Sequence, residues 1–230
     1  MIHKDFNCEI YFIRHGESES NATPGLAAGT DFDAPLTKLG HQQAKLLGER
    51  FKNDKINFDK VYCSTLIRAI QTTENIFMGM ESPNDSFQKV PEIIEQQVPG
   101  WRGIPTEEAY TGDTMTYMSE KGKDFVGPDG ESIREVQKRA TNWLEDELIY
   151  NRKLCRTPQS LKVAIIGHGN TMRSIFHYIM SFDQRLIYKV GVDNTSISRF
   201  IFNGKGWSVV CLNDSSHLKT GSSGTFENRG

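Results

Sequence analysis

The sequence predicts an α/β protein, a three-layer sandwich in which helices cover both faces of a mostly parallel central sheet of about six strands. Two observations support this fold class. Apolar runs that resemble buried strands, Ile10–Ile13 and Lys162–Ile166, alternate along the chain with segments of helical periodicity. Each run also stops abruptly at a polar cluster, as strands do where open α/β sheets bind ligands at their carboxyl ends.

The other elements follow the same alternation. Apolar residues at helical spacing predict a helix that begins after Thr37, its N-cap, and a long helix from Ile133 to Leu148. Ser64 is the expected cap of a third helix, which carries Arg68 on its first turns. The remaining predicted elements are strands at 58–63, 198–202 and 207–212, the last two joined by the hairpin turn Asn203-Gly204-Lys205-Gly206, and a helix from about 172 to 180.

The 230 residues fit a single domain, which we expect to span residues 1–212. Residues 79–90 are expected to form an exposed connection. A polar stretch near 104–125, with tyrosines and methionines interspersed, predicts a small cap inserted over the strand ends. Residues 213–230 are rich in Ser and Gly and almost free of apolar side chains, which indicates a poorly packed polar tail.

Composition excludes several classes of function. The formal net charge of -2 predicts no nucleic-acid-binding face, and no apolar run is long enough to span a membrane. The four cysteines are scattered and suggest neither a zinc site nor a disulfide framework. Without a signal-peptide pattern at the start, we expect a cytoplasmic protein with reduced thiols.

The two strand-end clusters predict a site for an anion. Arg14, His15 and Gly16 follow the first strand, and His168 follows the second between two glycines. With Arg68, they offer two guanidinium groups and two imidazoles, and a helix beginning near the second cluster would add its N-terminal amides. Such a pocket can stabilise a transferring phosphoryl group without a metal ion or another cofactor.

Several ordered motifs in this chain resemble those of the histidine phosphatase superfamily, in its phosphoglycerate-mutase-like branch. The resemblance extends from about residue 8 to 212 and rests on Arg14-His15-Gly16-Glu17-Ser18 with Asn21, Leu36-Thr37-Lys38-Leu39-Gly40, Ser64–Thr72 with Arg68, Glu95 ahead of Gly100-Trp101-Arg102-Gly103, Gly130-Glu131-Ser132 and Gly167-His168-Gly169.

The resemblance implies a role for each matching residue. His15 would attack phosphorus and become phosphohistidine, and Glu95 would protonate the leaving oxygen and then activate water. His168 would complete the catalytic set. The groups expected to hold the phosphoryl oxygens are Arg14, Asn21, Arg68, His168 and Gly169.

Alternatives stay open for three of these residues. Glu92 lies close to Glu95 in the chain, and the Pro-Gly-Trp stretch departs from the usual family spacing. Asn21 is a suitable cap for the loop that follows it, and Arg68 would also suit an ordinary salt bridge on its helix.

The expected function is metal-independent hydrolysis of a small-molecule phosphomonoester. Its closest rival is a cofactor-dependent phosphoglycerate mutase, which returns the phosphoryl group to the substrate. Mutases of the family carry basic residues after the catalytic glutamate, whereas residues 103–122 contain no Arg and only Lys121. A weakly active binding or scaffold relative and a protein phosphatase are further alternatives. The sequence leaves the substrate and the oligomeric state open, a homodimer being one alternative.

Overall fold

A six-stranded sheet forms the centre of the molecule. The computed structural model describes residues 3, 5–23, 25–27, 32–82, 86–156 and 159–218. The strands are β1 (Phe6–Arg14), β2 (Lys60–Ser64), β3 (Gln88–Val90), β4 (Gln159–Gly167), β5 (Ile197–Asn203) and β6 (Gly206–Asp214). Their order across the sheet is β3-β2-β4-β1-β5-β6.

The sheet is mostly parallel, as predicted. β1 pairs with β4 in parallel, with Arg14 opposite Gly167, and β2 pairs in parallel with both β4 and β3. Among these six strands only β5 is antiparallel to its neighbours, β1 and β6. The predicted hairpin turn joins β5 to β6, and Gly206 there has a φ of 100°, which glycine adopts without strain.

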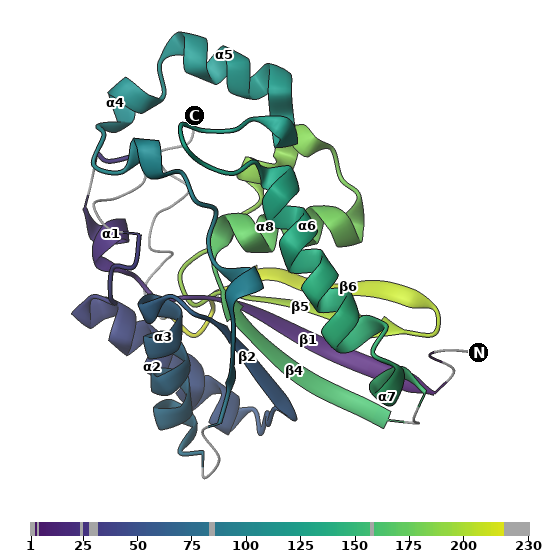
Figure 1. The fold of residues 1–230 in the computed structure, drawn as a ribbon. Coiled ribbons are helices and arrows are strands. Elements are labelled where there is room, and N and C mark those ends of the chain that lie inside the picture. Colours follow the sequence, from purple (N-terminus) through teal and green to yellow (C-terminus); the bar gives the residue numbers. More distant parts are fainter. Residues whose placement is uncertain are drawn as a thin grey trace.

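Helices cover both faces of the sheet (Figure 1), with α2 and α3 on one face and α6 and α8 on the other. The α-helices are α1 (Glu19–Ala22), α2 (Lys38–Asn53), α3 (Ile67–Met80), α4 (Thr106–Ala109), α5 (Gly112–Lys121), α6 (Ile133–Leu144), α7 (Arg152–Cys155) and α8 (Gly169–Met180). A π-helical turn, η4 (Glu145–Ile149), follows α6, and the 3₁₀ turns are η1 (Pro91–Ile93), η2 (Pro99–Trp101), η3 (Gly122–Asp124) and η5 (Gln184–Lys189).

Several boundaries differ from the sequence prediction. α8 begins at Gly169, with His168 as its N-cap, and therefore starts directly behind the strand-end cluster. The segment expected to be an exposed connection contains the end of α3 and the edge strand β3. β6 continues to Asp214, two residues beyond the predicted strand end, because its last residues bond to β5 and to the loop before it.

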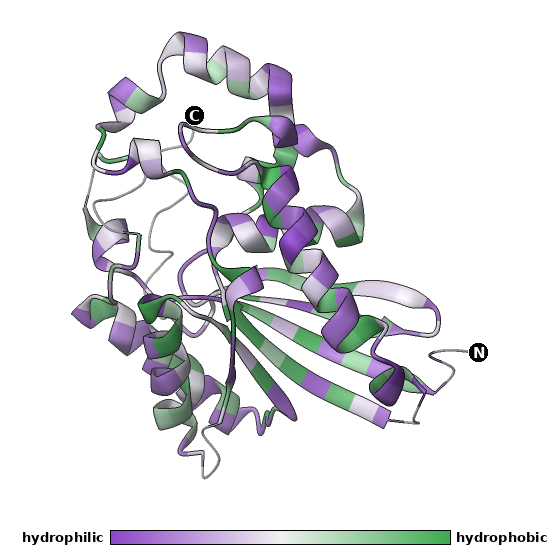
Figure 2. Cartoon of the chain, viewed as in Figure 1, coloured by the Kyte–Doolittle hydropathy of each residue, from purple (hydrophilic) through white to green (hydrophobic). Residues whose placement is uncertain are grey.

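Two hydrophobic clusters sandwich the sheet, because side chains alternate between its faces along each strand. Ile10 and Phe12 of β1 pack with α6 and α8, whereas Tyr11 and Ile13 pack with α2 and α3. Figure 2 shows the hydrophobic residues concentrated along the central strands. The clusters fix the sheet against its helices and thereby fix the carboxyl ends of β1, β2 and β4.

A third and smaller cluster lies away from the sheet, around Trp101, Ala109 and Phe125. It holds together η2, α4, α5 and η3, which Figure 1 shows on one side of the molecule, apart from β2 and β4. Within the described part of the chain, no helix is long and apolar enough to cross a membrane.

Candidate active site

The two histidines predicted from the sequence lie side by side at the strand ends. Because β1 and β4 are paired with Arg14 opposite Gly167, the next residue of each strand, His15 and His168, reaches the same point. Their ring centroids are 5.1 Å apart, and the N–H of His15 donates to the carbonyl of Gly167. Both side chains are buried.

Hydrogen bonds determine the tautomer of His15. The Nε of Arg68, which can only donate, lies 3.2 Å from His15 Nε2, so Nε2 must present its lone pair. The other nitrogen, Nδ1, then carries the proton and donates to the carbonyl oxygen of Gly16 at 2.6 Å. Burial and the charges of Arg68 and Arg14 hold the pKa of His15 well below its usual value. His15 is therefore a neutral imidazole with a nucleophilic Nε2.

His168 contacts Ser64, which the sequence predicted to be the cap of α3. Its Nε2 lies 2.7 Å from Ser64 Oγ, which also accepts the N–H of Leu66. Ser64 is not the cap of α3, since Leu66 occupies that position and makes no side-chain cap bond. Nδ1 of His168 is buried and has no hydrogen-bond partner among the residues described. Burial and the charge of Arg68 hold the pKa of His168 well below its usual value.

The two predicted arginines lie beside the histidines. Arg68 is buried on the first turn of α3, and besides His15 its Nη1 binds the carbonyl oxygen of Phe32 at 2.6 Å. Arg14 ends β1, and its Nη1 binds the carbonyl oxygen of Val192 at 2.7 Å. Both guanidinium groups are thus anchored at one nitrogen by backbone carbonyls, which fixes their direction.

Glu95 lies at the N-terminus of α8. Its carboxylate oxygens accept the N–H groups of Asn170 and Thr171, each at 3.3 Å, and that of Gln96 at 2.8 Å. The sequence predicted that these helix amides would bind the substrate anion. They bind the carboxyl group of Glu95 instead.

Glu95 and Arg14 meet at Gly169. A methyl group added to Gly169 would lie 3.2 Å from Arg173 Nη1 and 3.8 Å from both Arg14 Nε and Glu95 Oε2. The glycine therefore leaves room beside all three polar groups. The side chain of Glu92, the alternative glutamate, is exposed. The guanidinium of Arg139 binds the backbone carbonyl oxygens of both Glu92 and Glu95.

Asn21 forms a capping box on α1. Its Oδ1 accepts the N–H of Ser18, whose hydroxyl in turn accepts the N–H of Asn21. The alternative predicted from the sequence was a cap for the loop that follows Asn21, whereas these bonds reach back to Ser18. The same Oδ1 lies 3.3 Å from Asn194 Nδ2, which also donates to the carbonyl oxygen of His15.

The loop before β5 was missed by the sequence reasoning, although it holds the backbone of the site. Thr195 N–H donates to the carbonyl oxygens of Arg14 and His15, and Arg14 N–H donates to Ser196. Thr195 has a φ of 56°, an unusual conformation for a β-branched residue. His217, from the segment expected to be a tail, is buried against it, with Nε2 2.9 Å from Thr195 Oγ1.

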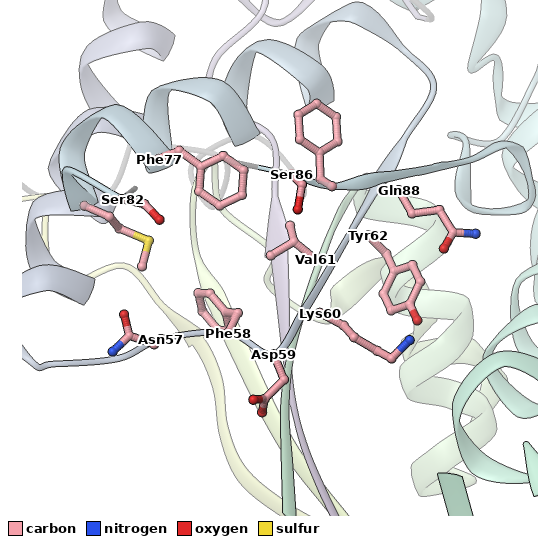
Figure 3. A pocket seen from close by; sticks show the side chains of 12 residues that line it. Asn57, Phe58, Asp59, Lys60, Val61, Tyr62, Phe77, Ser82, Ser86 and Gln88 are labelled. Carbon is pink, nitrogen blue, oxygen red and sulfur yellow. The ribbon is translucent and has the colours of Figure 1, made fainter. Parts of the chain in front are cut away.

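A separate cavity of about 520 Å³ lies at the opposite end of β2 from Ser64 (Figure 3). Its wall includes Phe58, Val61 and Phe77, and none of the predicted site residues lines it. Nor does any group of three His, Cys, Asp or Glu side chains in the described ranges lie close enough together to hold a metal ion.

The arrangement around His15 can bind a dianionic phosphate. Arg14 and Arg68 supply charge-assisted donors, and the unprotonated Nε2 of His15 accepts a hydrogen bond from the guanidinium of Arg68. Such fixed donors stabilise charge on a transferring phosphoryl group more effectively than water does.

Known proteins with similar sequences also act on phosphorylated molecules. The model of the histidine phosphatase superfamily (branch 1) matches residues 10–215. Phosphoserine phosphatase 1 of Hydrogenobacter thermophilus is 29% identical over 214 residues, which are 91% of this chain and 94% of that protein. The 2,3-bisphosphoglycerate-dependent phosphoglycerate mutase of Rhizobium etli is 30% identical over 173 residues, 72% of this chain and 77% of the mutase.

Solved structures share the fold. The crystal structure of phosphoglycerate mutase from Bacillus anthracis superposes with a TM-score of 0.75 at 18% identity and covers 94% of this chain and 97% of that one. The relatives with similar sequences thus include both hydrolases and mutases of phosphorylated small molecules.

Proposed function

Because the chain belongs to the histidine phosphatase superfamily, we propose that it hydrolyses a small-molecule phosphomonoester through a phosphohistidine at His15. The observation that carries this proposal is the fixed tautomer of His15, whose unprotonated Nε2 lies 3.2 Å from Arg68 Nε. A neutral imidazole that points its lone pair at a phosphate-binding guanidinium is prepared for attack on phosphorus.

In the first step, His15 Nε2 forms a bond to phosphorus while the ester P–O bond breaks. Glu95 gives a proton to the leaving oxygen, which departs as an alcohol. In the second step, Glu95 takes a proton from water, the water oxygen attacks phosphorus, and the N–P bond breaks to release inorganic phosphate. His15 is left neutral and Glu95 protonated, ready for another cycle.

The remaining residues stabilise the phosphoryl group during both steps. Arg14, Arg68 and His168 bind the phosphoryl oxygens next to His15 Nε2, and Gly169 leaves room beside Arg14 and Glu95. The weakest assignment is Asn21, whose Oδ1 caps α1 and contacts Asn194. We assign it a contribution through Asn194, which donates to the carbonyl oxygen of His15.

Hydrolysis is favoured over phosphoryl return by the composition of the cap, residues 104–125, which we place over the site. Its segment 103–122 contains no Arg and only Lys121, so few charges hold the dephosphorylated product in place for a second transfer. Water then reaches the phosphohistidine before the product is rephosphorylated.

Release of phosphate from p-nitrophenyl phosphate in the presence of EDTA tests this function. His15→Ala should lower kcat by about 1,000-fold or more, because the nucleophile is lost. His41→Ala is the matched control, since His41 contacts Asn75 on the outer helices. Turnover that survives in His15→Ala, or interconversion of 3- and 2-phosphoglycerate faster than phosphate release, would contradict the proposal.

A further inference from the structure

Arg139, on α6, binds the backbone around Glu95. Its Nη2 donates to the carbonyl oxygen of Glu95 at 3.1 Å, and its Nη1 donates to that of Glu92 at 2.5 Å. The same guanidinium forms a bidentate bond to the Glu131 carboxylate, from Nε to Oε2 at 3.1 Å and from Nη2 to Oε1 at 2.8 Å. Because these bonds use both sides of the planar fork, the guanidinium is fixed in one orientation.

Glu131 holds the residues that follow Glu95. Its Oε1 accepts the N–H of Gln97 at 3.0 Å, and its carbonyl oxygen accepts the side-chain amide of Gln96 at 2.9 Å. Its own N–H donates to the carbonyl oxygen of Gln97. A Cβ atom on the neighbouring Gly130 would lie 2.5 Å from that same oxygen, so the two backbones are in direct contact. The chain after Glu95 is thus bound by the residues just before α6.

These contacts start from a rigid element. α6 packs beside α8 (Figure 1), and Ala140, the neighbour of Arg139, is fully buried in the cluster that covers one face of the sheet. The side chains of Arg139 and Glu131 are only 21% and 19% exposed, so water screens their ion pair weakly. Glu95 is therefore held at its carboxyl group by α8 and at its backbone by α6.

We propose that Arg139, oriented by Glu131, is a positioning residue for Glu95, the group to which the proposed function assigns proton transfer. The inference rests on that function and adds the device that keeps the acid aimed at the leaving oxygen. Proton transfer requires the carboxyl group within hydrogen-bond reach of that oxygen, and a displacement of about 1 Å can lower a rate about 100-fold. Arg139 binds the backbone of Glu95, so its loss should act through Glu95.

The leaving group of the substrate tests this inference. Dinitrophenolate departs as a stable anion and needs no proton, whereas phenolate leaves slowly unless an acid protonates it. The comparison uses kcat/KM, which includes only the steps up to departure of the leaving group. Arg139→Gln should lower kcat/KM for phenyl phosphate at least about 10-fold more than that for 2,4-dinitrophenyl phosphate. Arg139→Lys should restore part of the difference, because a lysine keeps the charge without the planar fork.

Two further variants bracket the measurement. Glu95→Gln removes the acid and should separate the two esters still further, whereas Arg134→Gln breaks an exposed ion pair of α6 with Asp124 and should leave the wild-type ratio of the two kcat/KM values. A merely structural role would lower kcat/KM for both esters alike, so an unchanged ratio in Arg139→Gln would overturn the inference. If urea denaturation shows that Arg139→Gln does not fold, Glu131→Gln carries the same prediction and the same refutation.

Failure of the proposed function is seen separately in these assays. Turnover that persists in His15→Ala, or a wild-type ratio in Glu95→Gln, contradicts the roles proposed for those two residues. An unchanged ratio confined to Arg139→Gln and Glu131→Gln leaves the function intact and refutes only the positioning role.

Discussion

At the scale of single residues, we expect the hydroxyl of Ser64 to set the protonation pattern of His168. Ser64 Oγ accepts the N–H of Leu66, so its own hydrogen is available to His168 Nε2 at 2.7 Å. His168 is neutral because burial and nearby arginines hold its pKa well below the usual value. With Ser64 as the donor to Nε2, we expect Nδ1 to carry the single ring proton and to donate it to a phosphoryl oxygen.

Removal of the hydroxyl should disturb this pattern. We expect Ser64→Ala to lower kcat/KM by about 10-fold or more. Without the hydroxyl, Nε2 of His168 has no donor and competes with Nδ1 for the single ring proton. Ser174→Ala is the control, since Ser174 is equally buried but donates to the carbonyl oxygen of Thr171. Imidazole ¹⁵N chemical shifts report the tautomer directly; unchanged shifts together with unchanged kcat/KM would disprove the assignment.

The residues nearest the reaction were predictable, whereas those that hold them were not. His15 and His168 follow clear apolar runs, so the sequence marks them as strand-end groups. Asn194 and Thr195 lie in a loop without periodicity, and no property of threonine predicts a φ of 56°. For His217 the surrounding composition was misleading, because the ring is buried beside Thr195 although its neighbours in the sequence are polar.

At the scale of elements, the N-terminus of α2 packs directly on the loop that follows β1. A Cβ atom on Gly16 would lie 2.5 Å from the carbonyl oxygen of Gly40, and a Cβ atom on Gly40 would overlap the carbonyl oxygen of Glu17. Thr37 caps the helix by accepting the N–H of Gly40, which fixes its starting point. The order of the elements was predictable from periodicity, but this contact joins two backbones and leaves no pattern in side-chain hydropathy.

Gly40→Ala should therefore destabilise the protein by about 1–3 kcal/mol, because a backbone carbonyl cannot move aside as a flexible side chain would. It should also lower kcat, since the displaced loop begins at His15. Gly112→Ala is the matched control, because Gly112 also lies at a helix start but has open space around it. Urea denaturation measures both variants, and equal free energies of unfolding would refute the packing argument.

At the scale of the whole molecule, buried histidines make stability depend on pH. The pKa values of His15 and His168 are held well below 6.5, and burial lowers that of His217 to about 4. In the unfolded chain all three return to about 6.5, so below that pH the unfolded state binds more protons. The free energy of unfolding should fall as the pH drops below about 6.5.

His217 allows this effect to be measured without removing a proposed catalytic group. Each such histidine contributes a slope of up to about 1.4 kcal/mol per pH unit. His217→Gln keeps a donor for Thr195 Oγ1 but does not titrate. Between pH 6 and about 4.5, the free energy of unfolding of this variant should therefore fall less steeply than that of the wild type, by up to about 1.4 kcal/mol per pH unit. Urea denaturation at several pH values measures the slopes, and parallel curves for variant and wild type would contradict the prediction.

The strand order has a consequence for how the protein is made. β1 lies between β4 and β5, which come roughly 150 to 190 residues later in the chain. A ribosome adds about 5–20 residues per second, so the strand that carries His15 waits about 10–40 s for its neighbours. During that time Ile10, Phe12 and Ile13 lack the cover they have in the folded sheet. The first strand to be synthesised is therefore the one most exposed to chaperones and to aggregation.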